Sequence, residues 1–296
     1  MSSAVTVYHY DAFSNLANKG NPAGVVIGEE QLSEEQMQKI AYNVGFNETV
    51  FIILSNIADV KLKFFTPGHE INLCGHATMA SLYCLKTRGL LEGKDHITIE
   101  TNVGILDIHF STKNKQIYIE MNQSEPIFKP FNGDVHKLAQ SIGLSVNDID
   151  HSKPLVYGST GTWTLLIPIV QLYSFNKMIP VSKDFPQILS ENPRASIHPF
   201  CLETEHADAF MHARHFSSPY SGTIEDPVTG TASGVMGAYY LTYINKEINE
   251  TTFIVEQGQE IDRDGRVIVN AKRTNNNINV SIEGTAVFVK EMHIQL

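Results

Sequence analysis

Residues Asp226-Pro227-Val228-Thr229-Gly230-Thr231-Ala232 are the stretch that decides the fold. An acidic residue and a proline lead into a glycine, a hydroxyl side chain and a run of small and apolar residues, which predicts a loop and then a buried helix. The start of a helix carries unpaired N–H groups and partial positive charge, so it suits an anion. We therefore expect an anion-binding helix start here.

A second stretch, Leu73-Cys74-Gly75-His76-Ala77-Thr78-Met79-Ala80, follows the same pattern. Both stretches share Gly-x-Ala-(Ser/Thr) and continue with about ten mostly apolar, helix-compatible residues. The two glycines, Gly75 and Gly230, stand about half the chain apart. We interpret this as an internal duplication, in which two helix starts face one ligand between two lobes.

The composition limits the classes of function. The chain has 296 residues, of which 42% are hydrophobic and 18% are charged, as expected for a globular protein of two domains. A formal net charge of −10 argues against nucleic acid or an anionic membrane as a partner. The three cysteines, Cys74, Cys84 and Cys201, form no disulfide framework. With no secretory pattern at the N-terminus and no apolar run of about 20 residues, we expect a cytoplasmic protein.

Each half of the chain is predicted to hold many strands and one long helix that is apolar nearly all round. Ser33 and Gln36 form a capping-box pattern that predicts a helix to residue 44. The long helices are expected at 77–87 and 232–244, the turns at 20–24 and 158–161, and a linker at 123–133. Strands are predicted at 5–10, 25–27, 48–54, 60–66, 97–101, 105–110, 116–121, 153–156, 162–169, 196–204, 209–215, 252–256, 267–271, 278–283 and 286–294, and short helices at 135–142 and 185–190.

Glu48 is the first candidate catalytic residue. Strand alternation places it on the same face as Val50 and Ile52. A carboxylate on an apolar face loses hydration, and a carboxyl group brought close to neutrality can both take and give a proton. The alternative interpretation is a strand-end glutamate paired with a surface lysine.

Asp226 and the residues around both glycines are the next candidates. Asp226 has a structural alternative, as a helix N-cap with Pro227 at the first helical position, although the adjacent acid Glu225 favours function. Gly75-His76 and Gly230-Thr231 can offer backbone N–H groups to a carboxylate, and His76 can donate or relay a proton. Close helix packing, with His76 as an interior histidine, is the alternative.

The remaining sulfur and imidazole groups give weaker signals. The helix start favours a thiolate at Cys74, but a paired-thiol racemase would need a second cysteine at Asp226, and packing is the alternative. His206, His212 and His215 match no zinc spacing, so a metalloenzyme built on them is a remote reading. No nucleotide or metalloprotease motif is present.

Several stretches together resemble the PhzF family of phenazine-biosynthesis-like isomerases. They are Asp11-Ala12-Phe13, Gly20-Asn21-Pro22-Ala23, Asn47-Glu48-Thr49, Phe65-Thr66-Pro67, Cys74-Gly75-His76-Ala77-Thr78 and Glu225-Asp226-Pro227-Val228-Thr229-Gly230-Thr231-Ala232. The resemblance implies an α+β, diaminopimelate-epimerase-like fold of two pseudo-symmetric lobes, each a barrel-like sheet around a central helix, with the active site in the cleft between them. It places residues 1–125 with 278–296 in the N-terminal lobe and 126–277 in the C-terminal lobe.

The resemblance also implies an activity without cofactor or metal. The family isomerises trans-2,3-dihydro-3-hydroxyanthranilate by proton transfer, and its members are often homodimers. Carried onto this chain, Glu48 is the main acid/base, with Asp226 and His76 in support. Gly75, Gly230 and Thr231 would hold the substrate, beside Cys74 and with Thr231 in place of the serine that the family often has.

The substrate class that follows is a small carboxylate, whose identity the sequence does not specify. Two alternatives remain open. One is epimerase chemistry with Cys74 and Asp226 in the places of the two cysteines of related epimerases. The other is a non-catalytic protein that binds small anions in the same cleft.

Overall fold

The computed structural model describes residues 4–29, 31–275 and 277–296. Expectations about the first three residues and about the loop at Asn276 lie outside these ranges. Contacts divide the chain into a first unit, up to Asn122 together with Glu283–Leu296, and a second unit, Gln123–Ile282. Residues 123–125 and 278–282 are thus grouped with the second unit, whereas the family resemblance predicts them in the first lobe.

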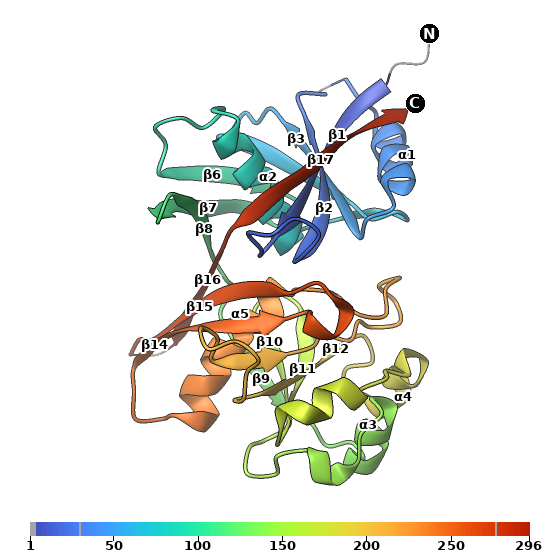
Figure 1. Ribbon diagram of the computed structural model, residues 1–296, viewed down its shortest axis with the longest axis vertical. Helices are drawn as coiled ribbons and strands as arrows, with labels where there is room; N and C mark the ends of the chain where they lie inside the picture. Colours follow the sequence, from blue (N-terminus) through green and yellow to red (C-terminus); the bar gives the residue numbers. More distant parts are fainter. Residues whose placement is uncertain (1–3, 30, 276) are drawn as a thin grey trace. The chain divides into compact units, whose positions relative to one another are not determined.

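The first unit is built from one continuous series of paired strands. In order of pairing, the series is β17, β1, β2, β3, β4, β6, β7 and β8, with the short β5 added beside β4. Figure 1 shows β17, in red, lying along β1, in blue. The elements are β1 Ala4–Ala12, β2 Asn21–Ile27, α1 Glu34–Val44, β3 Glu48–Ile53, β4 Val60–Phe65, β5 Glu70–Ile71, α2 Gly75–Thr87, β6 His96–Thr101, β7 Gly104–Lys113, β8 Gln116–Asn122 and β17 Ala286–Gln295.

The second unit contains a similar series, β9, β10, β11, β12, β13, β14 and β15. Its strands are β9 Ile127–Pro130, β10 Val156–Ser159, β11 Trp163–Pro168, β12 Ser196–Cys201, β13 Met211–Ala213, β14 Glu250–Gln257 and β15 Gly265–Arg273, and β16 Ile278–Gly284 crosses the boundary between the units. Its helices are α3 Val135–Ser141, α4 Phe185–Ile188 and α5 Gly230–Tyr239, with short 3₁₀ turns η1 Val146–Asp148, η2 Leu172–Lys177, η3 Ser182–Asp184 and η5 Gln259–Ile261.

The strand directions repeat between the two units. From β1 to β7 the pairings alternate antiparallel, parallel, antiparallel, parallel, antiparallel. From β10 to β15 they follow the same order. The parallel pairs β4–β6 and β13–β14 are joined through α2 and α5 respectively, because parallel neighbours need a crossover connection. The internal duplication predicted from the two glycine motifs is therefore present in the topology.

Both crossover helices are buried on nearly all sides, as their apolar sequences predict. In α5 the predicted helix to residue 244 is an α-helix only as far as Tyr239, and it continues as a π-helical turn, η4, over Tyr240–Ile244. A Cβ atom on Gly237 would lie 2.7 Å from Val269 Cγ1, so glycine lets β15 pack directly on this helix. In the first unit, α1 starts with the predicted Ser33–Gln36 capping box.

Three sequence expectations were wrong in detail. The predicted turn at 20–24 ends at Gly20, and Pro22 lies near the start of β2, where a proline is tolerated. The predicted linker at 123–133 contains β9, which pairs with β10. The strand expected at 153–156 instead runs over Val156–Ser159, because pairing on both sides extends it through Gly158. Among the described helices, none is both long and apolar enough to cross a bilayer.

Candidate active site

The two crossover helices begin in the same way. Cys74 is the N-cap of α2, and the Thr78 hydroxyl donates to the Cys74 carbonyl at 2.8 Å. Thr229 is the N-cap of α5, and the Ser233 hydroxyl donates to the Thr229 carbonyl at 3.0 Å. A glycine is the first helical residue in both cases. Cys74 and Thr229 are therefore equivalent positions of the duplication.

This equivalence corrects two expectations about Asp226. Helix α5 starts at Gly230, so Asp226 is not its N-cap and Pro227 is not its first helical residue. Asp226 also does not stand in the place equivalent to Cys74, which Thr229 occupies. Where a paired-thiol racemase would carry two cysteines, this chain therefore carries Cys74 at one helix start and Thr229 at the other.

A hairpin reaches each helix start. Asn21, the first residue of β2, places its Nδ2 atom 3.2 Å from His76 Nδ1. In the second unit, the Thr160 hydroxyl donates to the Thr231 carbonyl at 3.0 Å. His76 and Thr231 are each the second residue of their helix. The turns predicted at 20–24 and 158–161 thus belong to hairpins that each contact the second residue of a crossover helix.

Glu48 and His76 lie in contact in the first unit. Glu48 opens β3, and its Oε2 atom is 3.0 Å from His76 Nε2. The Glu48 side chain is 16% exposed and that of His76 is 7% exposed. The partner of Glu48 is thus a buried histidine and not a surface lysine. Simple alternation does not describe this strand, because Val50, Phe51 and Ile52 are all buried.

The sequence reasoning assigned no separate role to Asn21. Its amide faces His76 Nδ1 while the other ring nitrogen faces Glu48. A side-chain amide can donate through nitrogen to a neutral imidazole or, after rotation, accept from an imidazolium through oxygen. Asn21 is therefore suited to both charge states of His76. The signal available in the sequence was its place in the Gly20-Asn21-Pro22-Ala23 motif.

The charges of this cluster depend on one another. Burial on its own lowers the pKa of His76, but Cys74 and Glu48 outweigh burial and hold that pKa well above its usual value. Burial raises the pKa of the Cys74 thiol, and Glu48 adds to the rise while His76 opposes it. The thiolate expected from the helix start is not favoured.

Gly75 lies next to this cluster and has open space above it. Among the described residues, no atom comes within 4 Å of the place where a Cβ would stand. Its φ is not in the left-handed region. Neither packing nor backbone conformation requires a glycine here, so close helix packing does not explain the residue. A glycine whose missing side chain faces space suits the close approach of a ligand to the backbone.

In the second unit, Asp226 belongs to a tightly bonded loop. The Thr229 hydroxyl donates to Asp226 Oδ2. Gln257, only 1% exposed, donates from Nε2 to the Asp226 carbonyl at 2.7 Å and accepts from the Thr229 N–H at Oε1 at 3.1 Å. This glutamine clamps the loop that leads into Gly230 and Thr231. Gln257 directly follows the strand predicted at 252–256, and no sequence pattern singled it out.

The other polar candidates have structural partners. Glu225 forms a two-pronged ion pair with Arg214, at 2.8 and 2.6 Å, so its place beside Asp226 needs no catalytic explanation. His212 is held at 2.8 Å by both Glu256 and Glu260, and these partners outweigh its burial and raise its pKa to about 9.

The predicted histidine cluster does not form one ligand set. His206 contacts Glu256, whereas His215 lies with its Nδ1 3.1 Å from His198 Nδ1. Burial lowers the pKa of His215 to about 4. Within the described parts of the chain, the donors that come together as a possible metal-ligand set are instead Glu48, Cys74 and His76.

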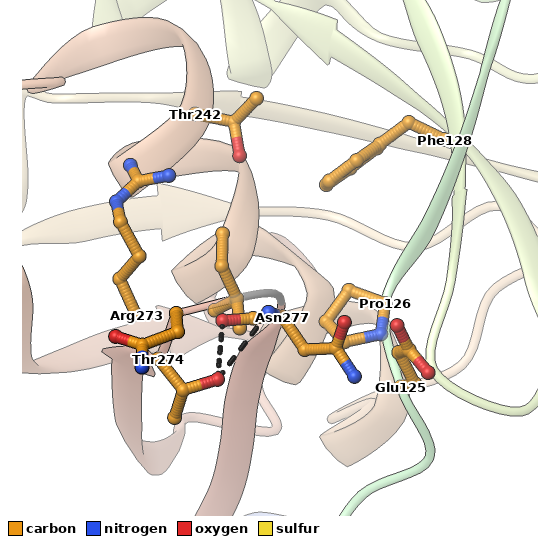
Figure 2. Close-up of a pocket in the computed structure, with 9 residues that line it drawn as sticks. Glu125, Pro126, Phe128, Thr242, Arg273, Thr274 and Asn277 are labelled. Atoms are coloured by element: carbon orange, nitrogen blue, oxygen red, sulfur yellow. Dashed lines mark hydrogen bonds between the residues drawn. The ribbon is translucent and has the colours of Figure 1, made fainter.

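A hollow of about 290 Å³ lies at the other end of α5 from Gly230. Figure 2 shows Arg273, Thr242 and Phe128 around it, with the Thr274 hydroxyl bonded to the backbone of Asn277. It contains none of the residues predicted to act on a substrate. The predicted site residues lie at or beside the helix start of their own unit and not in this hollow.

Comparison with known proteins decides the family. A profile of the phenazine biosynthesis-like protein family, PhzC-PhzF, matches residues 10–292. The protein YfhB of Bacillus subtilis, named an uncharacterized isomerase, is 50% identical over 282 residues, which cover 95% of this chain and 96% of that protein. The chain belongs to the PhzC-PhzF family. The PhzC-PhzF relative YddE of Escherichia coli K12, also named an uncharacterized isomerase, is 33% identical over 298 residues, 96% of each chain.

Solved structures agree with this membership. The crystal structure of a PhzF family protein from Bacillus anthracis is 52% identical, covers 99% of this chain and 100% of its own, and has a TM-score of 0.97. A hydroxyproline epimerase from Agrobacterium vitis shares the fold, with a TM-score of 0.63 at 10% identity, over 100% of this chain and 94% of that one. This PhzC-PhzF member has the predicted α+β, diaminopimelate-epimerase-like fold. It is an enzyme of the isomerase class.

Proposed function

We propose that this protein is a cofactor-independent isomerase that moves a proton between two carbons of a small carboxylate substrate, with Glu48 as the acid/base. The observation that carries the proposal is the 3.0 Å contact between Glu48 Oε2 and His76 Nε2, in which His76 is itself anchored by Asn21. A carboxylate in such a contact has a nearby group that can share its proton.

The duplication supports a functional reason for Glu48. The parallel pairing of β2 with β3 begins at Ala23 and Glu48, and that of β11 with β12 begins at Thr164 and Ser196. Glu48 is the first residue of β3, and the first residue of the corresponding strand β12 is Ser196. Since the same strand start is built there without a carboxylate, the fold itself does not demand one at residue 48.

In the proposed reaction, the Glu48 carboxylate takes a proton from one carbon and the electron pair of that C–H bond shifts into the conjugated substrate. Glu48 then returns the proton to a second carbon, so no atom or electron is gained or lost. Backbone N–H groups at Gly75, and at Gly230 and Thr231, would hold the carboxylate and stabilise the negative charge that develops. His76 and Asp226 would assist proton transfer.

Two of the earlier alternatives are less well supported. The raised pKa of the Cys74 thiol works against a thiolate base, and its equivalent position carries Thr229 instead of a second thiol. The isomerase names of the relatives favour an enzyme over a protein that only binds anions. The homodimer and the cytoplasmic location stay predictions, and light scattering would test the first.

Proton NMR in deuterated water tests the proposal. A panel of unsaturated and α-amino carboxylates, including trans-2,3-dihydro-3-hydroxyanthranilate, is incubated with wild type, Glu48→Gln and Cys74→Ala. We expect deuterium to enter a carbon position with wild type, and Glu48→Gln to slow this by at least about 10²–10⁴-fold, the usual contribution of a general acid/base. Exchange that survives Glu48→Gln but stops in Cys74→Ala would move the chemistry to the thiol.

A further inference from the structure

Glu48, Cys74 and His76 direct their donor atoms into one small volume. One ligand atom from each lies within 4.8 Å of the other two. A carboxylate oxygen, a thiol sulfur and an imidazole nitrogen are the three donor types that zinc accepts. We propose that these side chains form a site for one soft divalent cation, zinc or cadmium, and that the ion inhibits the enzyme. The inhibitory part rests on the function proposed for Glu48.

The distances suit a tetrahedral ion bound through His76 Nε2. This atom lies 3.0 Å from Glu48 Oε2 and 3.8 Å from Cys74 Sγ. Zinc bonds of about 2.0–2.3 Å set the ligand atoms of a tetrahedron roughly 3.4–3.6 Å apart. The two observed separations lie on either side of that range, but Cys74 Sγ is closer to His76 Nδ1, at 3.4 Å, so the Cys74 side chain has to rotate toward Nε2 to bind the same ion. The fourth position is left for water.

The surroundings of His76 also suit a metal ligand. A histidine that binds a metal through one ring nitrogen usually donates the N–H of the other to an oxygen. Asn21 faces His76 Nδ1 at 3.2 Å, and its rotated amide would present such an oxygen. The Glu48 side chain is 16% exposed, so solvent reaches the edge of the site.

Binding changes the site in a defined way. The Cys74 thiol releases its proton to solvent and the sulfur bonds the ion, while Glu48 bonds it through a carboxylate oxygen. A carboxylate that holds a cation is no longer available to take a proton from carbon. Thiolate is a soft ligand, so zinc and cadmium are preferred over magnesium and calcium, which favour all-oxygen sites.

Isothermal titration calorimetry of the full chain with zinc chloride and with cadmium chloride tests the site. We expect one tight ion per chain in wild type, at least tenfold weaker binding in Cys74→Ser and in Glu48→Gln, and no change in Cys201→Ser. Cys201 is the matched control, since it is a buried cysteine of the second unit whose bond to the Glu203 carbonyl a serine retains. The cadmium–thiolate absorption band should appear in wild type and Cys201→Ser and be absent from Cys74→Ser.

Two outcomes would overturn the proposed metal site. The exposed pair His96 and His109, with ring centroids 4.7 Å apart, can hold ions at the surface. Tight binding that persists in Cys74→Ser without a thiolate band would assign the ion to such surface histidines. Displacement of zinc by millimolar magnesium would contradict a soft site.

Experiments can contradict the proposed metal site and the proposed reaction independently of each other. Cadmium bound through Cys74, in a protein that exchanges no deuterium with any compound, would keep the site and remove the reaction. Deuterium exchange that continues at saturating zinc would keep the reaction and remove the inhibition.

Discussion

Asn21 Nδ2 lies 3.2 Å from His76 Nδ1, on the side of the ring opposite Glu48. The asparagine thereby anchors the imidazole that contacts the proposed base. Asn21→Ala should lower kcat roughly tenfold to a hundredfold, because a hydrogen bond to a buried group is worth about 1–3 kcal/mol. A positioning role also predicts that the pH dependence of kcat shifts in a definite order among variants of Asn21.

The imidazolium of His76 is best supported by aspartate at residue 21, less by asparagine and least by alanine. The alkaline limb of kcat should therefore lie at highest pH in Asn21→Asp and at lowest pH in Asn21→Ala. Thr160→Val is the matched control, because Thr160 makes the equivalent contact in the second unit. Equal loss of kcat in both Asn21 variants with an unmoved pH profile would contradict the role.

Gly75→Ala separates folding from substrate binding. Because open space surrounds the place of the added methyl group and φ is not left-handed, the variant should fold with a free energy of unfolding equal to or slightly above that of wild type. If the substrate approaches this backbone, KM should rise by tenfold or more. Gly237→Ala is the contrasting variant: its methyl group would meet Val269, and overpacking of this kind costs about 1–3 kcal/mol. An unchanged KM in Gly75→Ala would remove the residue from the proposed site.

Gln257→Met tests the clamp on the Asp226 loop. The substitution keeps the side-chain length but removes the bonds to the Asp226 carbonyl and the Thr229 N–H. We expect a rise in KM larger than the fall in kcat, since the loop leads to the residues proposed to hold the carboxylate. Urea unfolding should show a loss of about 1–3 kcal/mol. Gln259→Ala, in the same segment but bonded to Asp264, should leave KM unchanged.

His212 makes stability depend on alkaline pH. Glu256 and Glu260 outweigh burial and raise its pKa to about 9 from the ordinary 6.5, so the folded protein binds one more proton than the unfolded chain between these values. The stability from this group is therefore fully present below pH 6.5 and is lost as the pH rises through about 9. Urea unfolding of wild type from pH 6 to 9.5 should show the decline.

His212→Asn should reduce the slope of that decline while lowering stability at pH 6.5. The remaining slope would report other histidines with a raised pKa, including His76. An identical slope in wild type and His212→Asn would show that His212 does not keep its proton in this range.

Local patterns predicted most of the fold because they act over a few residues. Ser33 and Gln36 marked the start of α1, and the apolar run after Gly75 marked α2. The errors arose where pairing with strands far away in the sequence decides the secondary structure. Pro22 lies within β2 because β1 and β3 frame it, and β9 forms in a proline-rich stretch because β10 is beside it. No local pattern contains those partners.

The candidate site was predictable in its composition but not in its contacts. The motifs singled out Glu48, Cys74 and His76, which the fold brings together. They gave no reason to choose Asn21 or Gln257 as supports, since each acts on a residue far away in sequence. The position of Asp226 relative to the start of α5 could not be predicted either. That start depends on where the loop held by Gln257 ends.

The pairing of β17 with β1 has a consequence for synthesis on the ribosome. The proposed base and its histidine belong to the first unit, but a strand of that unit, β17, is translated only after the whole of the second unit. Folding during translation usually proceeds from the N-terminus. Here all residues of the second unit are translated before β17. Until β17 follows, the edge of β1 that pairs with it is exposed. Chaperones that shield strand edges would therefore matter most for the nascent chain during that interval.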